Sequence, residues 1–121
     1  MTLVDTSVWI DFFRRGSGAS PLAAVLEAGD ACTHAFVIGE LALGSLGRRR
    51  REILADLRLL PALPIVADGE VHQLVEARGL PGSGIGWVDA HLLASALAAH
   101  AGLWTLDRSL RRAAAALRVG L

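Results

Sequence analysis

Short apolar runs alternate along the chain with longer stretches of helical periodicity, and this alternation is the main guide to the fold. The apolar runs predict buried strands at residues 2–4, 31–35, 63–66, 103–106 and 119–121. Strands that are apolar throughout and separated by helices are typical of a parallel sheet covered on both faces. The pattern therefore predicts an α/β fold with a sheet between two layers of helices.

Capping and breaking residues set the expected helix boundaries. Thr6 or Ser7 is expected to cap a first helix that runs through Phe13, and Ser20 to cap a second helix with Pro21 at its first position. Further helices are expected at 36–46, 48–60, 68–79, 87–101 and 107–117, with Asp68 and Asp107 as caps and loops at 16–18 and 80–86. No internal repeat or linker interrupts this order, so residues 1–121 are expected to form one domain.

Composition supports a packed globule and removes several classes of protein. The hydrophobic content is 53% and the mean hydropathy is +0.46, while twelve arginines balance twelve acidic residues and lysine is missing. A net charge of zero means that any nucleic-acid site must be local. The one cysteine, Cys32, rules out an internal disulfide and is expected in the core. The longest apolar stretch, about fifteen residues, falls short of the ~20 that span a bilayer, so we expect a soluble, cytoplasmic protein.

Four carboxylates interrupt apolar segments, where a protein normally places none. Asp5 ends the first apolar run, Glu40 lies inside AFVIGELALGSL, Asp89 inside WVDAHLLASALAAH, and Asp107 follows LWTL. Carboxylates are rarely buried unless a group of opposite charge pairs with them. Because lysine is missing and most arginines lie elsewhere, a divalent metal ion is the simplest shared partner.

Each of these acids also has an ordinary interpretation when taken singly. Glu40 could lie at the margin of an apolar stripe and reach water, and Asp89 could face the dipole of its helix. Asp107 could be a helix cap, and Asp5 could accept hydrogen bonds from the turn at Thr6 and Ser7. Their joint placement favours a site, because Asp5 and Asp107 both end predicted strands and ligands gather at that edge of a parallel sheet.

Other chemistries lack their motifs. A phosphate-binding loop of the Walker type needs a lysine, and Gly82, Gly84 and Gly86 form GxGxG rather than GxGxxG. No GxSxG elbow and no HExxH spacing occur, so the histidines at 34, 72, 91 and 100 are expected to be ordinary polar or capping residues. A receiver-like phosphotransfer domain is disfavoured by the missing lysine and by the missing acidic pair after the first strand.

The chain resembles the PIN-domain ribonucleases, and in particular the small VapC-type toxins of toxin–antitoxin pairs. The matching segments are LVDTSVWIDFF, IGELALG, VDAHLLASAL and LWTLDRSL. The resemblance implies a five-stranded parallel sheet of order 3-2-1-4-5 flanked by helices. It also implies that Asp5, Glu40, Asp89 and Asp107 are the metal-site acids and that Thr6 or Ser7, together with Thr105, supports them. The run Arg108-Ser109-Leu110 departs from the family, which often has another acid or a Phe there.

The resemblance further implies a cofactor, a reaction and partners. Mg²⁺ or Mn²⁺ would activate water for RNA cleavage, leaving a 5′-phosphate and a 3′-hydroxyl. A cognate antitoxin and a homodimer are expected, with Trp9, Phe12 and Phe13 as a candidate dimer surface. Arg48–Arg51 could bind RNA, bind the antitoxin or form a solvated face, and the arginines 108, 111 and 112 could guide RNA. The alternative is a catalytically silent PIN-like module that binds RNA or protein without metal.

Overall fold

The computed structural model describes residues 1–16 and 20–121 of the chain. The strands are β1 (Thr2–Val4), β2 (Ala31–Cys32) and β3 (Gly102–Trp104). The helices are α1 (Thr6–Arg15), α2 (Pro21–Glu27), α3 (Ala35–Leu43), α4 (Arg50–Leu57), α5 (Asp68–Ala77), α6 (Trp87–Ala99) and α7 (Arg108–Ala116), with a 3₁₀ turn at Gly47–Arg49. Of the loop predicted at 16–18, only Gly16 lies within the described residues.

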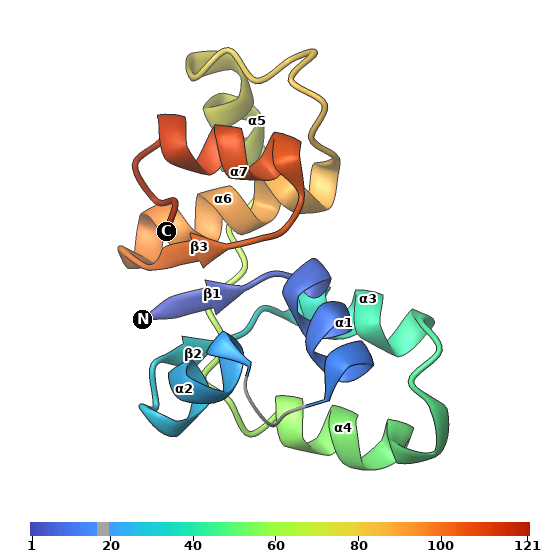
Figure 1. Ribbon diagram of the computed structural model, residues 1–121. Coiled ribbons are helices and arrows are strands. Elements are labelled where there is room, and N and C mark those ends of the chain that lie inside the picture. Colours follow the sequence, from blue (N-terminus) through green and yellow to red (C-terminus); the bar gives the residue numbers. More distant parts are fainter. Residues whose placement is uncertain (17–19) are drawn as a thin grey trace.

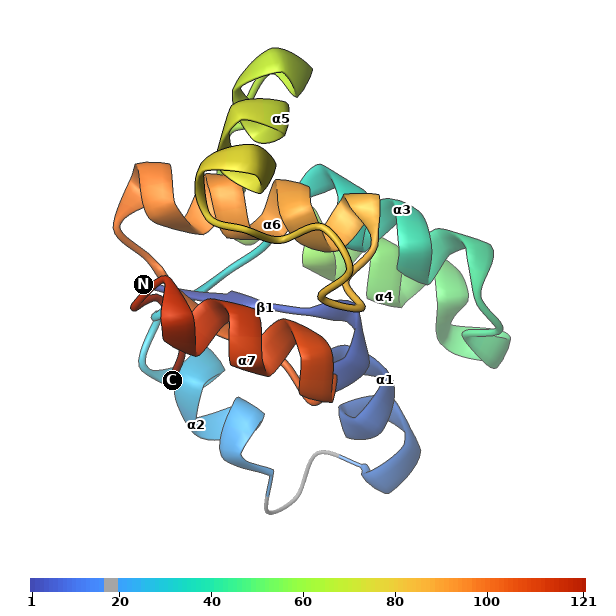
Figure 2. The same cartoon turned by 90° about the horizontal axis from the view of Figure 1, so that it is seen from above.

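A parallel sheet forms the centre of the molecule, with β1 between β2 and β3. Leu3 pairs with Cys32 on one side and with Leu103 on the other. Seen edge-on in Figure 2, the sheet has α3 and α6 on one side and α2 and α7 on the other. The predicted three-layer α/β class is therefore confirmed.

The outer two strands of the predicted sheet are reduced to single bridges in the described residues. Thr33 bridges to Ala62 and Leu103 bridges to Gly120, both in parallel, so the lateral order still follows 3-2-1-4-5. The strand predicted at 63–66 is wrong, because only Ala62 pairs and Pro64 has no N–H with which to extend the pairing. The strand predicted at 119–121 is also wrong.

The bridge between Leu103 and Gly120 does not extend into a strand, because the backbone N–H groups beside it already donate to α7. The N–H groups of Val119 and Gly120 both donate to the carbonyl of Ala114, after Arg118 turns the chain with a φ of 61°. A helix that ends in a left-handed residue commonly returns its next N–H groups to its own last turn. These donors are therefore not available for a ladder with β3.

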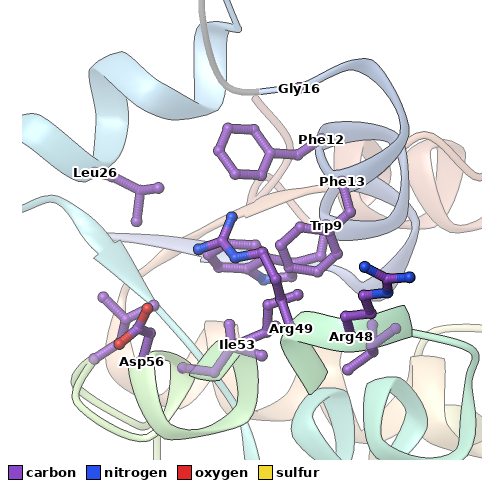
Figure 3. Close-up of a pocket in the computed structure, with 12 residues that line it drawn as sticks. Trp9, Phe12, Phe13, Gly16, Leu26, Arg48, Arg49, Ile53 and Asp56 are labelled. Carbon is purple, nitrogen blue, oxygen red and sulfur yellow. The ribbon is translucent and has the colours of Figure 1, made fainter. Parts of the chain in front are cut away.

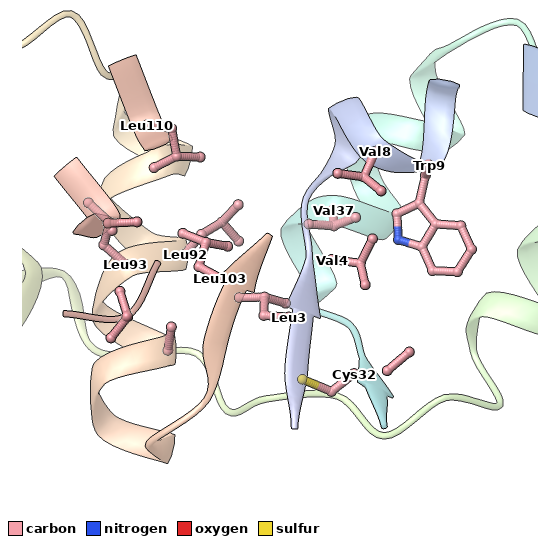
Figure 4. Close-up of a cluster of buried hydrophobic side chains, with 14 of the residues drawn as sticks. Leu3, Val4, Val8, Trp9, Cys32, Val37, Leu92, Leu93, Leu103 and Leu110 are labelled. Atoms are coloured by element: carbon pink, nitrogen blue, oxygen red, sulfur yellow. The ribbon is translucent and has the colours of Figure 1, made fainter. Parts of the chain in front are cut away.

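The core lies between the sheet and both helix layers. Figure 4 shows Leu3 and Leu103 of the sheet facing Leu92 of α6, with Val37 of α3 and Trp9 of α1 beyond β1. Cys32 is also fully buried, as predicted. A smaller cluster, Val71, Ala90 and Ala94, holds α5 against α6. These contacts fix the first turn of α6, which carries Asp89.

Several helix boundaries differ from the prediction. Thr6 and Ser7 lie inside α1, whose cap position is occupied by Asp5 without a side-chain bond, so the predicted cap is wrong. Asp68 is the first residue of α5 rather than its cap. The segment predicted as one helix over 48–60 divides into the 3₁₀ turn and α4, and α3 ends at Leu43 instead of residue 46.

The predicted caps of α2 and α7 are confirmed, because Ser20 Oγ accepts from Leu22 N at 3.1 Å and Asp107 Oδ2 from Leu110 N at 2.9 Å. Helix α6 ends at Ala99, two residues before its predicted end, and Gly102 begins β3. Among the residues that the structure describes, none of the helices is both long enough and apolar enough to span a bilayer.

Candidate acidic site

Asp5 is the buried centre of the candidate site. It follows β1 directly, its backbone N–H donates to Trp104 O at 2.9 Å, and the residue is 5% exposed. Its Oδ2 accepts two hydrogen bonds of 2.7 Å, one from Ser7 Oγ and one from Thr105 Oγ1. A carboxylate withdrawn from water needs such donors, because desolvation penalises its charged form.

The same two hydroxyls connect the ends of β1 and β3. Ser7 Oγ accepts from Leu106 N at 3.0 Å, and Thr105 Oγ1 accepts from Asp107 N at 3.0 Å. Asp107 is thereby positioned at the start of α7, where its Oδ2 caps the helix. The ordinary interpretation of Asp107 as a cap is therefore correct, and it leaves the second carboxylate oxygen uncommitted.

Glu40 joins the cluster from α3. Its Oε1 accepts a 2.7 Å hydrogen bond from Thr6 Oγ1 across 34 residues of sequence. Glu40 is exposed, which agrees with the ordinary interpretation of an acid at the margin of an apolar stripe and not with an enclosed carboxylate. The bond to Thr6 nevertheless fixes its carboxylate beside the first turn of α1. Thr6 and Ser7 thus act on different acids, whereas the sequence predicted one or the other as a support.

Asp89 lies in the first turn of α6, where its Oδ2 accepts from Gly86 N, the backbone donor at the N-cap position, at 3.0 Å. Burial raises the pKa of Asp89, the Gly86 N–H opposes this, and the negative charges of Asp5, Asp107 and Glu40 raise the pKa further. These contributions mean that Asp5, Asp107 and Glu40 each lie within electrostatic reach of Asp89. Asp89 is therefore the residue at which the crowding of negative charge is felt.

The donor chemistry of the cluster fits a hard divalent cation. Each of the four carboxylates uses one oxygen in the bonds given above, and its other oxygen accepts no hydrogen bond from the described residues. None of the four is paired with an arginine or histidine in the described part of the chain. Oxygen ligands with no internal cation suit Mg²⁺ or Mn²⁺.

The side chains as they stand do not enclose an ion. Within residues 1–16 and 20–121, no three acidic, histidine or cysteine side chains converge as closely as a formed metal site requires. Like charges held without a counterion repel one another, which favours this open arrangement. The structure places the predicted acids near one another and joins Asp5 and Glu40 to hydroxyl groups, but it does not bring three of them to metal-binding distance in the described residues.

Two hollows extend from the acidic cluster along α1. The first, of about 420 Å³, includes Glu40, Ile10 and Arg14 in its wall. The second, of about 590 Å³, lies between α1 and α4. Phe13 and Leu46 line both hollows, so the two are adjacent and together extend from Glu40 to α4. We call this feature the α1–α4 groove.

Aromatic rings and arginines meet in the outer part of the α1–α4 groove (Figure 3). Phe12 and Phe13 are half-buried and face Ile53 and Arg49 across it. Trp9 is only 3% exposed, so it belongs chiefly to the core and not to a dimer surface of three exposed rings. The groove thus combines apolar side chains with two arginines, Arg48 and Arg49, and one acid, Asp56.

The arginines predicted to bind partners have unequal roles. Arg50 donates to the carbonyls of Ala42 and Gly44 and so completes the end of α3. Arg49 pairs with Glu52 at 3.1 Å and, together with Arg48, lines the α1–α4 groove. Arg111 donates to Thr105 O at 3.2 Å, which ties α7 to β3. Arg50 therefore has a structural role at the end of α3 that the three alternatives left open for Arg48–Arg51 did not include.

A cluster of aromatic and histidine rings beside α6 was not among the features predicted from the sequence. His34 caps α3 by accepting from Phe36 N at 3.0 Å, and its Nε2 lies 3.0 Å from Ser95 Oγ, which donates to Pro64 O. The fully buried His91 has its Nε2 3.2 Å from Asp68 Oδ1, without the alignment of a hydrogen bond. Its i, i+4 spacing from Trp87 was the available signal.

Comparison with known proteins defines the class to which this fold and site belong. The PIN-domain family model matches residues 2–116. Ribonuclease VapC32 of Mycobacterium tuberculosis, from strains CDC 1551/Oshkosh and H37Rv, is 45% identical over 123 residues, covering 100% of this chain and 96% of the relative. The crystal structure of PAE2754 from Pyrobaculum aerophilum shares the fold with a TM-score of 0.69 at 18% identity, covering 99% of this chain and 87% of the other.

The chain therefore belongs to the PIN-domain family. The resemblance to the VapC type that its motifs indicated is confirmed by the full-length similarity to Ribonuclease VapC32.

Proposed function

We propose that residues 1–121 form one PIN domain that acts as a divalent-metal-dependent endoribonuclease, the toxin of a toxin–antitoxin pair. The observation that carries this proposal is the cluster of four carboxylates around Asp89, each with an uncommitted oxygen and none paired with a cation in the described residues. The 45% identity to a protein named as a ribonuclease supports RNA as the substrate. The expected products carry a 5′-phosphate and a 3′-hydroxyl.

Asp5, Glu40, Asp89 and Asp107 are the proposed ligands of Mg²⁺ or Mn²⁺. When bound, the ion supplies positive charge that offsets both the acids and the phosphodiester, and it activates water. The chain's own contribution is to hold the ligands in place. Ser7 and Thr105 orient Asp5, Thr6 orients Glu40, and the Gly86 N–H orients Asp89. Such supporting bonds commonly change metal affinity or activity by about 10–100-fold when removed.

The α1–α4 groove is the proposed docking site of the antitoxin. Its apolar floor of Phe12, Phe13 and Ile53 fits an apolar segment, and its continuity with Glu40 lets that segment reach the acids. An arginine or other cation at the inner end of the segment would imitate the charge of the metal. Acidic residues at its outer end would meet Arg48 and Arg49.

We also propose a homodimer, as the resemblance implied. The buried position of Trp9 leaves Phe12 and Phe13 as the half-buried rings of the predicted dimer surface, and the antitoxin and a second copy would compete for them. Light scattering of the chain with and without the antitoxin tests this. A dimer that persists when the antitoxin binds would place the dimer contact on another face.

The alternative is a silent module that keeps the fold and binds no metal. Retention of all four acids and of every hydroxyl support argues against it, since a silent module gains nothing from crowded carboxylates. The deciding experiment incubates the chain with a pool of cellular RNAs and Mg²⁺, Mn²⁺ or a chelator, and maps the new 5′ ends. Metal-dependent cleavage at defined positions is expected, and RNA binding without cleavage under every condition would favour the silent module.

A further inference from the structure

An exposed indole lies at the start of the helix that carries Asp89. Trp87 is the first residue of α6, two positions before Asp89, and it follows Gly86, whose N–H holds the Asp89 carboxylate. Its side chain is 43% exposed. A single exposed apolar side chain needs no explanation by itself, so the rings packed around this indole matter more than its exposure.

Rings from three helices hold this indole in place. His72 of α5 stacks on it in a tilted arrangement, with centroids 4.6 Å apart and an interplanar angle of 35°. His91, one turn along α6, meets it edge-on at 4.8 Å and 90°, and Phe36 of α3 meets His91 at 4.9 Å. Figure 2 shows α5 lying over α6, with the connecting loop descending to the start of α6. The indole is therefore oriented before any ligand binds.

A covering role accounts for only part of this arrangement. The edge contact shields His91, which is fully buried, and a leucine or methionine would shield it as well. Shielding does not explain why a second ring, the exposed His72, stacks on the indole from another helix. A tilted pair of rings, both partly open to solvent, offers a nucleobase an aromatic surface on which to stack.

We propose that Trp87 and His72 form a stacking platform for a base of single-stranded RNA next to the scissile phosphate. This inference rests on the ribonuclease function proposed above. The chain has no net charge, so we expect phosphate contacts alone to give it a low affinity for RNA. Stacking of a base on aromatic rings adds affinity that does not depend on charge. A base in a duplex already has neighbours on both faces, so the platform selects unpaired segments such as loops and ends.

Fluorescence of a base analogue tests the platform without relying on cleavage. The probes are 12-nucleotide oligouridine RNAs with 2-aminopurine at a different position in each, studied in Mg²⁺ with the Asp5→Asn background to suppress cleavage. Stacking on an indole quenches 2-aminopurine, and we expect quenching at one or two adjacent positions. Annealing the probe to a complementary strand should abolish it.

A matched set of variants separates stacking from folding. Trp87→Leu should remove the quenching and weaken probe binding by roughly 10-fold, while Trp87→Phe should keep most of the affinity because it retains a ring. His72→Leu should fall between them. Leu59→Ala is the control, because it also truncates an exposed apolar side chain (83% exposed) but on the turn after α4. Circular dichroism checks that each variant is folded.

The outcomes also separate this inference from the proposed function. With Asp5 restored and an RNA that the parent cleaves, Trp87→Leu should raise KM by roughly 10-fold and change kcat by less than about twofold. Equal quenching and affinity in the parent and Trp87→Leu, or no quenching with any probe, would overturn the platform even if cleavage is intact. Quenching in a chain that cleaves no RNA would support the platform as an RNA-binding surface and overturn only the nuclease.

Discussion

The acidic site and the α1–α4 groove are neighbours that share Glu40, yet they are built on opposite principles. The site is small and negative, and hydroxyls from residues far apart in the sequence hold its acids. The groove is wide and apolar, and its two charged arginines lie on the rim. In the proposed function, the first binds a cation and the second binds the antitoxin. This contrast means that catalysis and inhibition can be disturbed separately, although the two regions are in contact.

The largest expected effect is on the acidic side. Asp5→Asn keeps the size of the side chain and removes a ligand charge, so Mg²⁺- or Mn²⁺-dependent cleavage should fall by at least about 100-fold. The free energy of unfolding should stay within about 1 kcal/mol of the parent, because an amide oxygen can still accept from Ser7 and Thr105 and one repelling charge is gone. Cleavage assays and urea unfolding measure the two quantities. Full activity in this variant would contradict the metal site.

The groove should show the next largest effect, on the partner alone. Ile53→Asp places a charge on the apolar floor and should weaken antitoxin binding by roughly 10–100-fold, with cleavage unchanged. Ala55→Asp is the matched control, because residue 55 is exposed on the same helix and does not line the groove. Calorimetric titration of the antitoxin measures the difference. Equal weakening by both variants would mean that the charge acts through α4 as a whole.

The rim arginines give a smaller, salt-dependent version of the same test. Arg48→Glu with Arg49→Glu should weaken antitoxin binding by about 10-fold at low salt and reduce its salt dependence. Arg50 is left unchanged, because its hydrogen bonds to the carbonyls of Ala42 and Gly44 stabilise the end of α3. Arg112→Glu on the exposed face of α7 is the control. If the double variant binds like the parent at both salt concentrations, Arg48 and Arg49 are only a solvated face.

Two buried threonines test whether the hydroxyls position Asp5. Thr105→Val removes one of its two donors and should lower cleavage by roughly 10-fold and stability by about 1–2 kcal/mol. Thr33→Val is the matched control, since Thr33 is also fully buried but its Oγ1 has no partner among the described residues. That control should unfold at the same or a higher urea concentration than the parent. Equal loss of activity in both variants would assign the effect to packing.

The smallest effect concerns pH and the metal-free chain. The folded state raises the pKa of Asp89 above its ordinary value of 3.8, so the folded state binds this proton more tightly than the unfolded state. The resulting stabilisation is complete below pH 3.8 and is lost as the pH rises through the raised pKa. Asp89→Asn should therefore gain stability relative to the parent as the pH rises from 4 to 7 in chelator. A constant difference in unfolding free energy across that range would show that Asp89 is not crowded by its neighbours.

The acids were predictable because each breaks an apolar run, and the sheet brings such breaks to one edge. The sequence could not predict that Thr6 donates to Glu40 while Ser7 donates to Asp5. Adjacent helical residues point about 100° apart, and only the packing of α3 against α1 decides that Thr6 meets Glu40. The outer strands were overpredicted because apolar runs do not reveal where backbone donors are already used, as at Ala114. The rings around Trp87 come from three helices whose packing no local pattern encodes.

The hydrogen bond from Thr105 to Asp5 can form only late in the synthesis of the chain. It joins positions 100 residues apart, and the backbone contacts of Ser7 and Asp107 depend on the same junction. At synthesis rates of about 5–20 residues per second, a ribosome exposes Asp5 on the order of ten seconds before it can supply Thr105. Throughout that interval the nascent chain carries its acids apart from one another. The acidic site of a protein proposed to cleave RNA is therefore incomplete until β3 has been made and has paired with β1.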